Sequence, residues 1–174
     1  RSFLKIQDGC NYNCSYCTIP LARGKSRNLS ISTIIKEAED IASKGFKEVV
    51  LTGVNTGDFG RTTGEDFLDL LKALNNVEGI ERYRISSIEP NLLREDIIRW
   101  IADGSKFQRH FHIPLQAGSD TVLAAMRRRY NTKMFAEKIA MVRRIMGDVF
   151  FGIDVIVGFP GETDEEFQNC YNFL

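Results

Sequence analysis

The sequence lacks a long hydrophobic run: no stretch approaches the roughly 18 apolar residues that a membrane-spanning helix requires. It also lacks the charged and then apolar opening of a secretory signal peptide. We therefore expect a soluble, cytoplasmic protein with no membrane partner. The chain begins at Arg1 without an initiator methionine and reaches Leu174 inside a helical pattern, so we expect it to be an excerpt of a longer protein.

Excess charge of one sign is absent as well, because 23 Lys and Arg balance 23 Asp and Glu. Net charge therefore indicates nothing about partners. The first thirty residues carry five basic side chains against Asp8 alone, and Arg127, Arg128 and Arg129 form a second basic run. Such local basic surface suits a nucleic acid or another anion, but a solvated charged face explains it equally, and on charge alone we favour the solvated face.

Cysteine is scarce and unevenly placed, with three of the four residues inside one stretch of eight. A disulfide framework needs pairs and an oxidising compartment, so this distribution fits it poorly. The spacing of Cys10, Cys14 and Cys17 is C-x3-C-x2-C. Thiolates in such a group select iron–sulfur clusters, zinc or Cu(I).

A structural zinc site would need a fourth protein ligand, and the sequence near the loop offers no further Cys or His. An electron-transfer ferredoxin would likewise complete its cluster with a fourth Cys. Three thiolates on a cubane cluster leave one iron open for a substrate or cofactor. The spacing alone favours a cluster and leaves zinc, or three unrelated cysteines, as open alternatives.

Strand and helix patterns alternate along the chain, which is long enough for one domain with a substantial core. The strands are expected at 3–6, 48–52, 82–87, 109–115 and 149–157. The helices are expected between an N-cap at Ser32 and Gly45, around 67–74 and 93–101, at about 120–128 and 132–146, and from about 163. The last strand is largely apolar, as expected for a parallel strand buried on both faces.

About five successive βα units predict an α/β domain with a parallel sheet. A doubly wound sheet would bind its ligand at a strand-order switch, whereas a barrel gathers all βα loops at one end. The unusual residues follow four different strands, which favours a barrel. Because about five units fall short of eight, we expect an open, partial TIM-type barrel.

The cysteine loop, directly after the first strand, resembles the signature of the radical S-adenosylmethionine (SAM) superfamily. Further segments resemble the radical SAM methylthiotransferases across nearly the whole chain: 19–24, 52–55, 112–120, 126–130 and 154–163. The resemblance implies that Cys10, Cys14 and Cys17 hold a [4Fe-4S] cluster whose open iron binds SAM. It also implies that SAM is cleaved to a 5′-deoxyadenosyl radical that abstracts hydrogen from a C–H bond.

Segments 6–10, 51–57 and 84–90 are most similar to the threonylcarbamoyladenosine branch of this family. That branch implies a transferase that adds a methylthio group to an adenosine of tRNA beside the anticodon. Isopentenyladenosine in tRNA and an aspartate of a ribosomal protein are the alternative substrates, although Val54 stands where the isopentenyl branch usually has Gln. A zinc-binding RNA module is the alternative that is not an enzyme.

The family also implies parts that lie outside this sequence. These are an N-terminal domain with a second [4Fe-4S] cluster, a last βα unit, and a C-terminal β domain that binds RNA. The expected partners are tRNA, SAM and a reducing electron donor such as flavodoxin or ferredoxin.

The resemblance assigns contacts with SAM or the cluster to nine further residues, each of which also has an ordinary structural explanation. They are Tyr16, Gly53, Asn55, Ser87, Gln116, Ser119, Arg129, Val155 and Gly158. Ser119, for example, is equally suited to cap a helix. We expect Arg127 and Arg128 to be surface charges, Cys170 to be a packed core thiol, and only one of His110 and His112 to point into the barrel.

Overall fold

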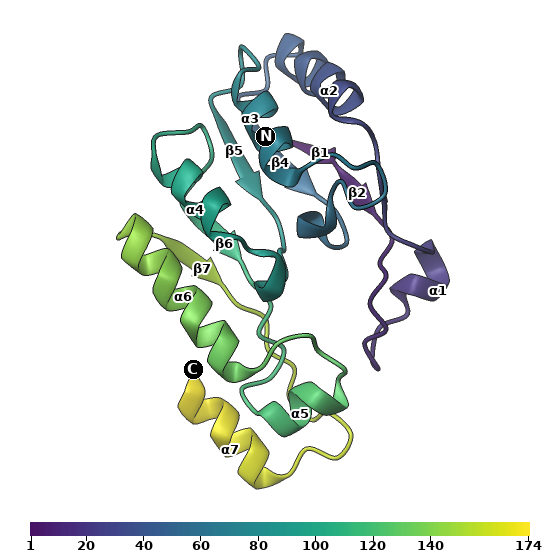
Figure 1. The fold of residues 1–174 in the computed structure, drawn as a ribbon, viewed down its shortest axis with the longest axis vertical. Coiled ribbons are helices and arrows are strands. Elements are labelled where there is room, and N and C mark those ends of the chain that lie inside the picture. The colour runs from purple at the N-terminus through teal and green to yellow at the C-terminus, as the bar shows by residue number, and fades with distance from the viewer.

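The computed structural model describes all residues, 1–174, and its central feature is a parallel sheet whose strands follow chain order (Figure 1). The parallel strands are β1 (Ser2–Lys5), β4 (Glu48–Thr52), β5 (Arg82–Ile85), β6 (His110–His112) and β7 (Phe150–Gly152). β1, β4 and β5 form one ladder, and β6 pairs with β7. Parallel bridges from Tyr83 to Phe107 and from Ser87 to His112 join β5 to the β6 segment. With no strand-order switch, this is the partial barrel that was predicted, not a doubly wound sheet.

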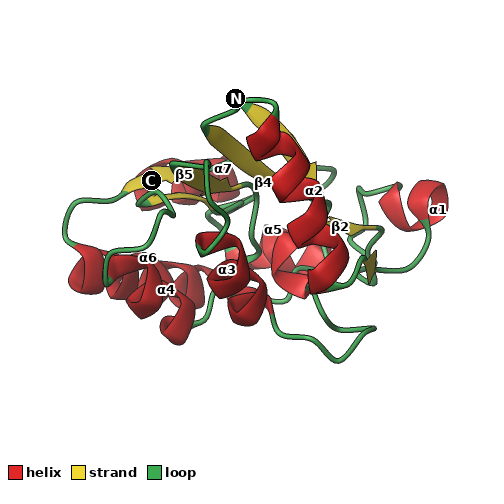
Figure 2. Ribbon diagram, turned by 90° about the horizontal axis from the view of Figure 1, so that it is seen from above, coloured by secondary structure: helices red, strands yellow, loops and turns green.

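Part of the helices covers one face of this sheet, and Figure 2 shows α3, α4 and α6 together on one side of the strands, whereas α1 projects away from it in Figure 1. The helices are α1 (Ile19–Arg23), α2 (Ile31–Ser43), α3 (Phe67–Asn75), α4 (Glu95–Ala102), α5 (Asp120–Ala125), α6 (Thr132–Met146) and α7 (Asp164–Phe173). Short 3-10 turns occupy η1 (Thr56–Asp58) and η2 (Pro90–Leu92), and β2 (Gln7–Asp8) pairs antiparallel with β3 (Arg27–Asn28). None of the helices combines the length and hydrophobicity that crossing a bilayer requires.

Alternation along the strands separates an apolar face from a polar one. Leu51, Tyr83 and Phe111 are fully buried beneath the helices and belong to the main core of 27 buried residues. Their neighbours Thr52 and Arg84 point to the opposite face, which the helices leave open. This second face is the interior of the partial barrel.

Three expectations about local structure were wrong. Ser30, not Ser32, caps α2, and its side chain accepts a hydrogen bond from the Thr33 backbone N–H. Both histidines of β6 lie on the barrel side, because residues two apart in a strand share a face and the intervening Phe111 fills the core.

The last strand is also shorter than the expected 149–157, since only Phe150–Gly152 of this apolar run is regular strand. β7 pairs with β6 alone, so one of its edges has no neighbouring strand. Phe150 is 64% exposed and Val157, beyond the strand, is 59% exposed. These are the exposures within residues 1–174, in which no strand follows β7.

Glu48 organises a cluster of charges where the strands begin, at the end of the barrel away from the cysteine loop. Its buried carboxylate contacts Arg82 at 2.5 Å and Arg84 at 3.5 Å, and it also pairs with Arg1. The hydrogen bond from Arg82 is the main cause that lowers the pKa of Glu48 to about 2. The folded state therefore binds a proton on Glu48 much more weakly than the unfolded chain does.

We expect this carboxylate to contribute to acid stability. A depressed pKa gives stabilisation that is complete above the unfolded value of 4.5 and is lost as the pH falls towards about 2. Glu48→Gln should therefore lower the melting temperature at neutral pH and flatten its decline across this window. Thermal unfolding of both proteins between pH 7 and about 2 measures this. Glu37→Gln, on the exposed face of α2, is the matched control, and a Glu48→Gln curve parallel to wild type would contradict the prediction.

Candidate functional site

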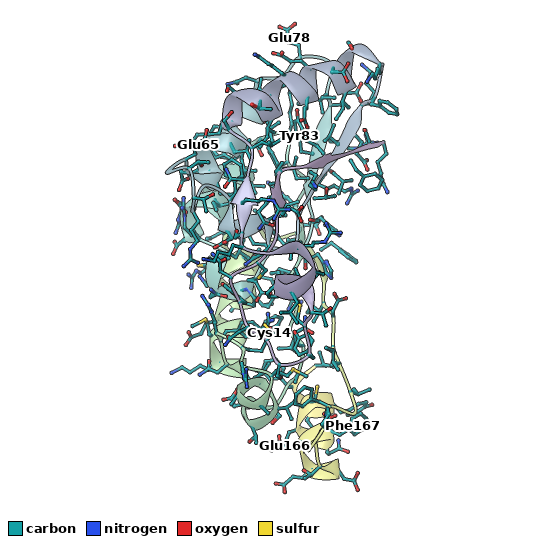
Figure 3. All side chains as sticks on the ribbon, turned by 90° about the vertical axis from the view of Figure 1, so that its right-hand side faces the viewer. Cys14, Glu65, Glu78, Tyr83, Glu166 and Phe167 are labelled. Carbon is teal, nitrogen blue, oxygen red and sulfur yellow. The ribbon has the colours of Figure 1, made fainter.

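The loops that follow the carboxyl ends of the strands meet around the cysteine loop, residues 9–17. Ser15 donates from its backbone N–H to the carbonyl of Met126 at 3.2 Å and from its hydroxyl to that of Ala125 at 2.9 Å. Tyr12 accepts a hydrogen bond at its hydroxyl from Asn91, which follows β5. Figure 3 shows Cys14 midway along the molecule, between the sheet that contains Tyr83 and the α7 residues Glu166 and Phe167.

The start of the cysteine loop is held by the segment that leads into β3. Gly9 has φ +70°, and a Cβ there would lie 2.2 Å from the carbonyl oxygen of Lys25, so this position requires glycine. The Cys10 N–H donates to the Gly24 carbonyl at 3.1 Å, and the Ser26 N–H donates to the Asn11 side chain at 3.1 Å. The backbone around Cys10 is thereby fixed on both sides.

The three thiols of this loop are free and lie at different depths. Cys14 is buried, while Cys10 and Cys17 are partly exposed. Burial is the main cause that raises the pKa of Cys10, and nearby acidic groups, including Cys14 and Glu89, add to it. The Cys10 sulfur nevertheless accepts a hydrogen bond from the Tyr12 backbone N–H at 3.3 Å.

The donor set fits an iron–sulfur cluster better than a single metal ion. No three Cys, His, Asp or Glu side chains converge closely enough to hold a single ion, as a structural zinc site requires. A cluster uses one thiolate for each of several irons, and its ligands therefore surround a larger body. Three thiols on one loop, without a carboxylate or imidazole among them, have the softness that such clusters select.

Arg128 connects this loop to the ends of β5 and α5, which corrects the expectation that it is a surface charge. Its side chain is 4% exposed and forms an ion pair with Glu89. One guanidinium nitrogen donates to the Cys14 sulfur and to the Tyr16 hydroxyl, both at 3.2 Å, and Nε donates to Tyr130 at 3.2 Å. Burial opposes its charge, but Glu89 outweighs burial and raises the pKa of Arg128.

The two flanking arginines differ from Arg128. Arg127 is exposed and has φ +58°, as expected for a surface residue at a sharp turn. Arg129 is also exposed, but its guanidinium lies 3.8 Å from the centre of the Tyr12 ring and donates to the Asn11 carbonyl at 3.4 Å. Arg129, one of the expected SAM contacts, therefore lies against the cysteine loop.

Asn55 has a buried side-chain amide without any hydrogen-bond partner. The residue is 3% exposed, and neither its side-chain oxygen nor its nitrogen has a hydrogen-bond partner. A buried amide without partners is costly, so it marks a position where a ligand or ordered water belongs. Gly53, two residues earlier, would place a Cβ 3.0 Å from the Gln7 side-chain oxygen, so its small size serves packing. Beside this turn a cavity of about 440 Å³ opens between Gly53, Val54 and α1.

The other expected contacts of β5, β6 and β7 lie on adjoining loops. Ser87 accepts at its carbonyl a hydrogen bond from the Thr56 hydroxyl at 2.8 Å. Gln116 has φ +67°, a strained conformation that non-glycine residues adopt mainly where function requires it. Its backbone bridges to Val155. The Ser119 hydroxyl caps α5 by accepting from the Val122 N–H at 3.4 Å, so the structural explanation applies to this residue.

Helix α7 supports the loop that carries Gln116. The Gly118 N–H donates to the Cys170 sulfur at 3.0 Å, and a Cβ on Gly118 would lie 2.7 Å from Cys170 Cα. Cys170 is therefore the packed core thiol that was expected. Gly158 lies farther out, exposed and at φ +73°, so only its backbone is available to a ligand there.

A pair of titratable residues on the barrel side remains outside the expected set. His112 Nε2, at the end of β6, lies 2.9 Å from a carboxylate oxygen of Asp154, which follows β7. The larger cavity of about 720 Å³ lies at the other end of these strands, beside Arg84 and His110, and is remote from the cysteine loop. Volume alone would therefore have pointed to the wrong end of the barrel.

Comparison with known proteins identifies the family: residues 4–174 match the model of the radical SAM superfamily. The chain is 44% identical over 176 positions to the threonylcarbamoyladenosine tRNA methylthiotransferase MtaB of Bacillus subtilis (strain 168), covering all of this chain and 39% of the relative. It is 41% identical over 176 positions to the tRNA-2-methylthio-N(6)-dimethylallyladenosine synthase of Alkaliphilus oremlandii (strain OhILAs), covering all of this chain and 37% of that protein. The chain thus spans about two fifths of the length of these relatives.

Two solved structures share the fold at low sequence identity. The radical S-adenosylmethionine methyltransferase TsrM of Kitasatospora setae, with cobalamin and a [4Fe-4S] cluster bound, has a TM-score of 0.77 and 17% identity, over 98% of this chain and 33% of that one. The cobalamin-dependent radical enzyme OxsB has a TM-score of 0.77 and 14% identity, over 99% of this chain and 26% of that one. At this identity the likeness concerns the fold alone.

Proposed function

Because the chain belongs to the radical SAM superfamily, we propose that it is the catalytic core of a transferase that adds a methylthio group to an adenosine in tRNA. The observation that carries the proposal is the cysteine loop: three free thiols on one loop at the carboxyl end of a parallel partial barrel. The relatives extend well beyond this chain, so the complete reaction needs flanking domains, with a second [4Fe-4S] cluster and an RNA-binding surface among their proposed contents.

Cys10, Cys14 and Cys17 are the proposed ligands of the [4Fe-4S] cluster. When bound, the cluster and SAM supply the means to take hydrogen from an unactivated C–H bond. Arg128 donates a charged hydrogen bond to the Cys14 sulfur, and Glu89 balances the charge of Arg128. Tyr16 is exposed, and its hydroxyl accepts a hydrogen bond from the same Arg128 nitrogen that contacts this thiol.

SAM is proposed to lie across the loops after β4, β6 and β7. Asn55 has two unused hydrogen-bonding atoms for the polar groups of the methionine portion of SAM. Gly53, which has no side chain, lets the ligand approach the backbone of the same turn closely. Arg129 is available to a carboxylate from the edge of the cysteine loop. The remaining proposed contacts are Ser87, Gln116, Ser119, Val155 and Gly158. Val155 offers a half-buried side chain to an adenine ring, and Gly158 offers an exposed backbone whose N–H already donates to Glu162.

Threonylcarbamoyladenosine is the proposed substrate, and the 44% identity to the Bacillus subtilis relative supports it. Dimethylallyladenosine, the substrate class named for the relative at 41% identity, is the second candidate. Val54, in place of the Gln usual in the isopentenyl branch, favours the first. Partners and location follow from this function: tRNA, SAM and a cytoplasmic reductant such as flavodoxin or ferredoxin.

The test begins with anaerobic reconstitution of the full-length protein. We expect bound iron and sulfide, a brown chromophore, and cleavage of SAM when dithionite is added. Incubation with tRNA that carries threonylcarbamoyladenosine or dimethylallyladenosine, followed by mass spectrometry of the nucleosides, identifies the substrate. Tight zinc without a chromophore, together with intact SAM, would refute the proposal and favour a zinc-binding RNA module.

A further inference from the structure

Gln7 is a buried amide that uses both of its polar atoms. It is 2% exposed and lies in β2, directly after the first strand of the barrel. Its nitrogen lies 2.8 Å from the Gly9 carbonyl oxygen and 3.0 Å from the Ser26 hydroxyl. Its oxygen accepts hydrogen bonds from the backbone N–H groups of Asn55 at 2.8 Å and Val54 at 3.0 Å.

These partners leave one orientation for the amide. If the amide were turned over, its NH₂ group would face two N–H donors and its oxygen would face the Gly9 carbonyl. The contacts with the Gly9 carbonyl and with both backbone N–H groups would then be repulsive, and only the Ser26 hydroxyl could adapt by donating instead of accepting. The orientation is therefore fixed by the surrounding backbone, and the side chain is a rigid link between two segments.

The two linked segments hold different parts of the proposed site. Gly9 immediately precedes Cys10, and Ser26 belongs to the segment that binds Asn11. The other end of the link is the turn that carries Asn55, whose side-chain amide has no partner. This turn packs tightly against Gln7. A Cβ added at Gly53 would lie only 3.1 Å from the Gln7 carbonyl oxygen.

We infer that Gln7 is a positioning residue, which sets the distance and orientation between the cysteine loop and the Asn55 turn so that both can hold one SAM molecule. The inference rests on the proposed function and concerns the recognition of SAM. Gln7 does not touch the thiols, so its loss should weaken SAM binding while the cluster is retained. A purely structural amide would instead affect stability and iron content together.

Two variants of the reconstituted full-length protein test this. Gln7→Met keeps a similar shape and removes all of these hydrogen bonds. Gln7→Glu keeps an acceptor for the turn, but its second oxygen can donate to the Gly9 carbonyl only when the carboxyl is neutral. Burial favours the neutral form, so lowering the pH should restore the wild-type contacts.

Iron content, the change that SAM causes in the spin-resonance spectrum of the reduced cluster, and KM and kcat for SAM cleavage are measured at several pH values. We expect Gln7→Met to keep its iron, to raise KM for SAM about tenfold and to weaken the spectral change. We expect KM of Gln7→Glu to fall towards wild type as the pH is lowered. Gln168→Met, on the exposed face of α7, is the matched control. The pH profile of the wild type, measured in parallel, shows the part of any pH dependence that comes from the neighbouring Asp8.

Wild-type KM in both variants would overturn the inference while leaving the proposed function intact. Joint loss of stability and iron in Gln7→Met, with no recovery of Gln7→Glu at low pH, would show that the amide is only structural. Failure of the wild type itself to hold a cluster or cleave SAM would refute the proposed function, and the inference with it.

Discussion

Replacing Cys14 by alanine should lower the iron content of the reconstituted protein by about four atoms per chain and abolish SAM cleavage. Cys14 is the buried member of the proposed ligand set and the one that Arg128 contacts. No other thiol of these 174 residues is placed to replace it, because the remaining cysteine, Cys170, is buried behind the Gly118 loop and already accepts a hydrogen bond there. A cluster with two remaining thiolates would be lost.

Cys170→Ala is the matched control for this experiment. Like Cys14→Ala, it removes one thiol and the hydrogen bond that the sulfur accepts. It should nevertheless leave iron, sulfide and the visible spectrum unchanged. Iron and sulfide analysis of wild type and both variants, prepared in parallel, gives the result. Retention of the full iron content by Cys14→Ala would contradict the assignment, and equal losses in both variants would indicate a folding defect instead.

Most of the helices and strands could be predicted from the apolar patterns of the sequence. The apolar spacing of Phe67, Leu70, Leu71 and Leu74 predicted α3, and all four side chains are buried. Glu48–Thr52 is a strand with the predicted bounds. Boundaries were less predictable where several residues compete, as at the start of α2, where Ser30, Ser32 and Thr33 are all able to cap and only the backbone geometry selects Ser30.

The site was predictable where spacing encodes the chemistry and not elsewhere. The thiols could be proposed as ligands because three soft donors in eight residues are rarely accidental. Arg128 could not, because a run of three arginines has no period that separates inward from outward side chains. The left-handed Arg127 turns the chain after α5, and the next guanidinium then reaches Glu89 and Cys14. Gln7 gave no signal because its role depends on Asn55, a residue 48 positions away.

Replacing Arg128 by methionine should destabilise the protein by about 3–5 kcal/mol, since it leaves the Glu89 carboxylate, 15% exposed, without its partner. The double variant Arg128→Met with Glu89→Gln removes both charges and should recover most of this loss. Thermal or denaturant unfolding of the two single variants and the double variant measures the coupling. Arg127→Met, at the exposed neighbouring position, should be close to neutral.

The same double variant separates stability from the tuning of the cluster. Restoring the charge balance at Glu89 does not restore the hydrogen bond from Arg128 to the Cys14 sulfur. A positive charge and an N–H donor beside a ligand sulfur favour the reduced cluster, so the stable double variant should still have a lower reduction potential than wild type. Potentiometric titration of the reconstituted protein measures this difference. A wild-type potential in a well-folded double variant would mean that Arg128 acts on the fold through Glu89 and not on the cluster through Cys14.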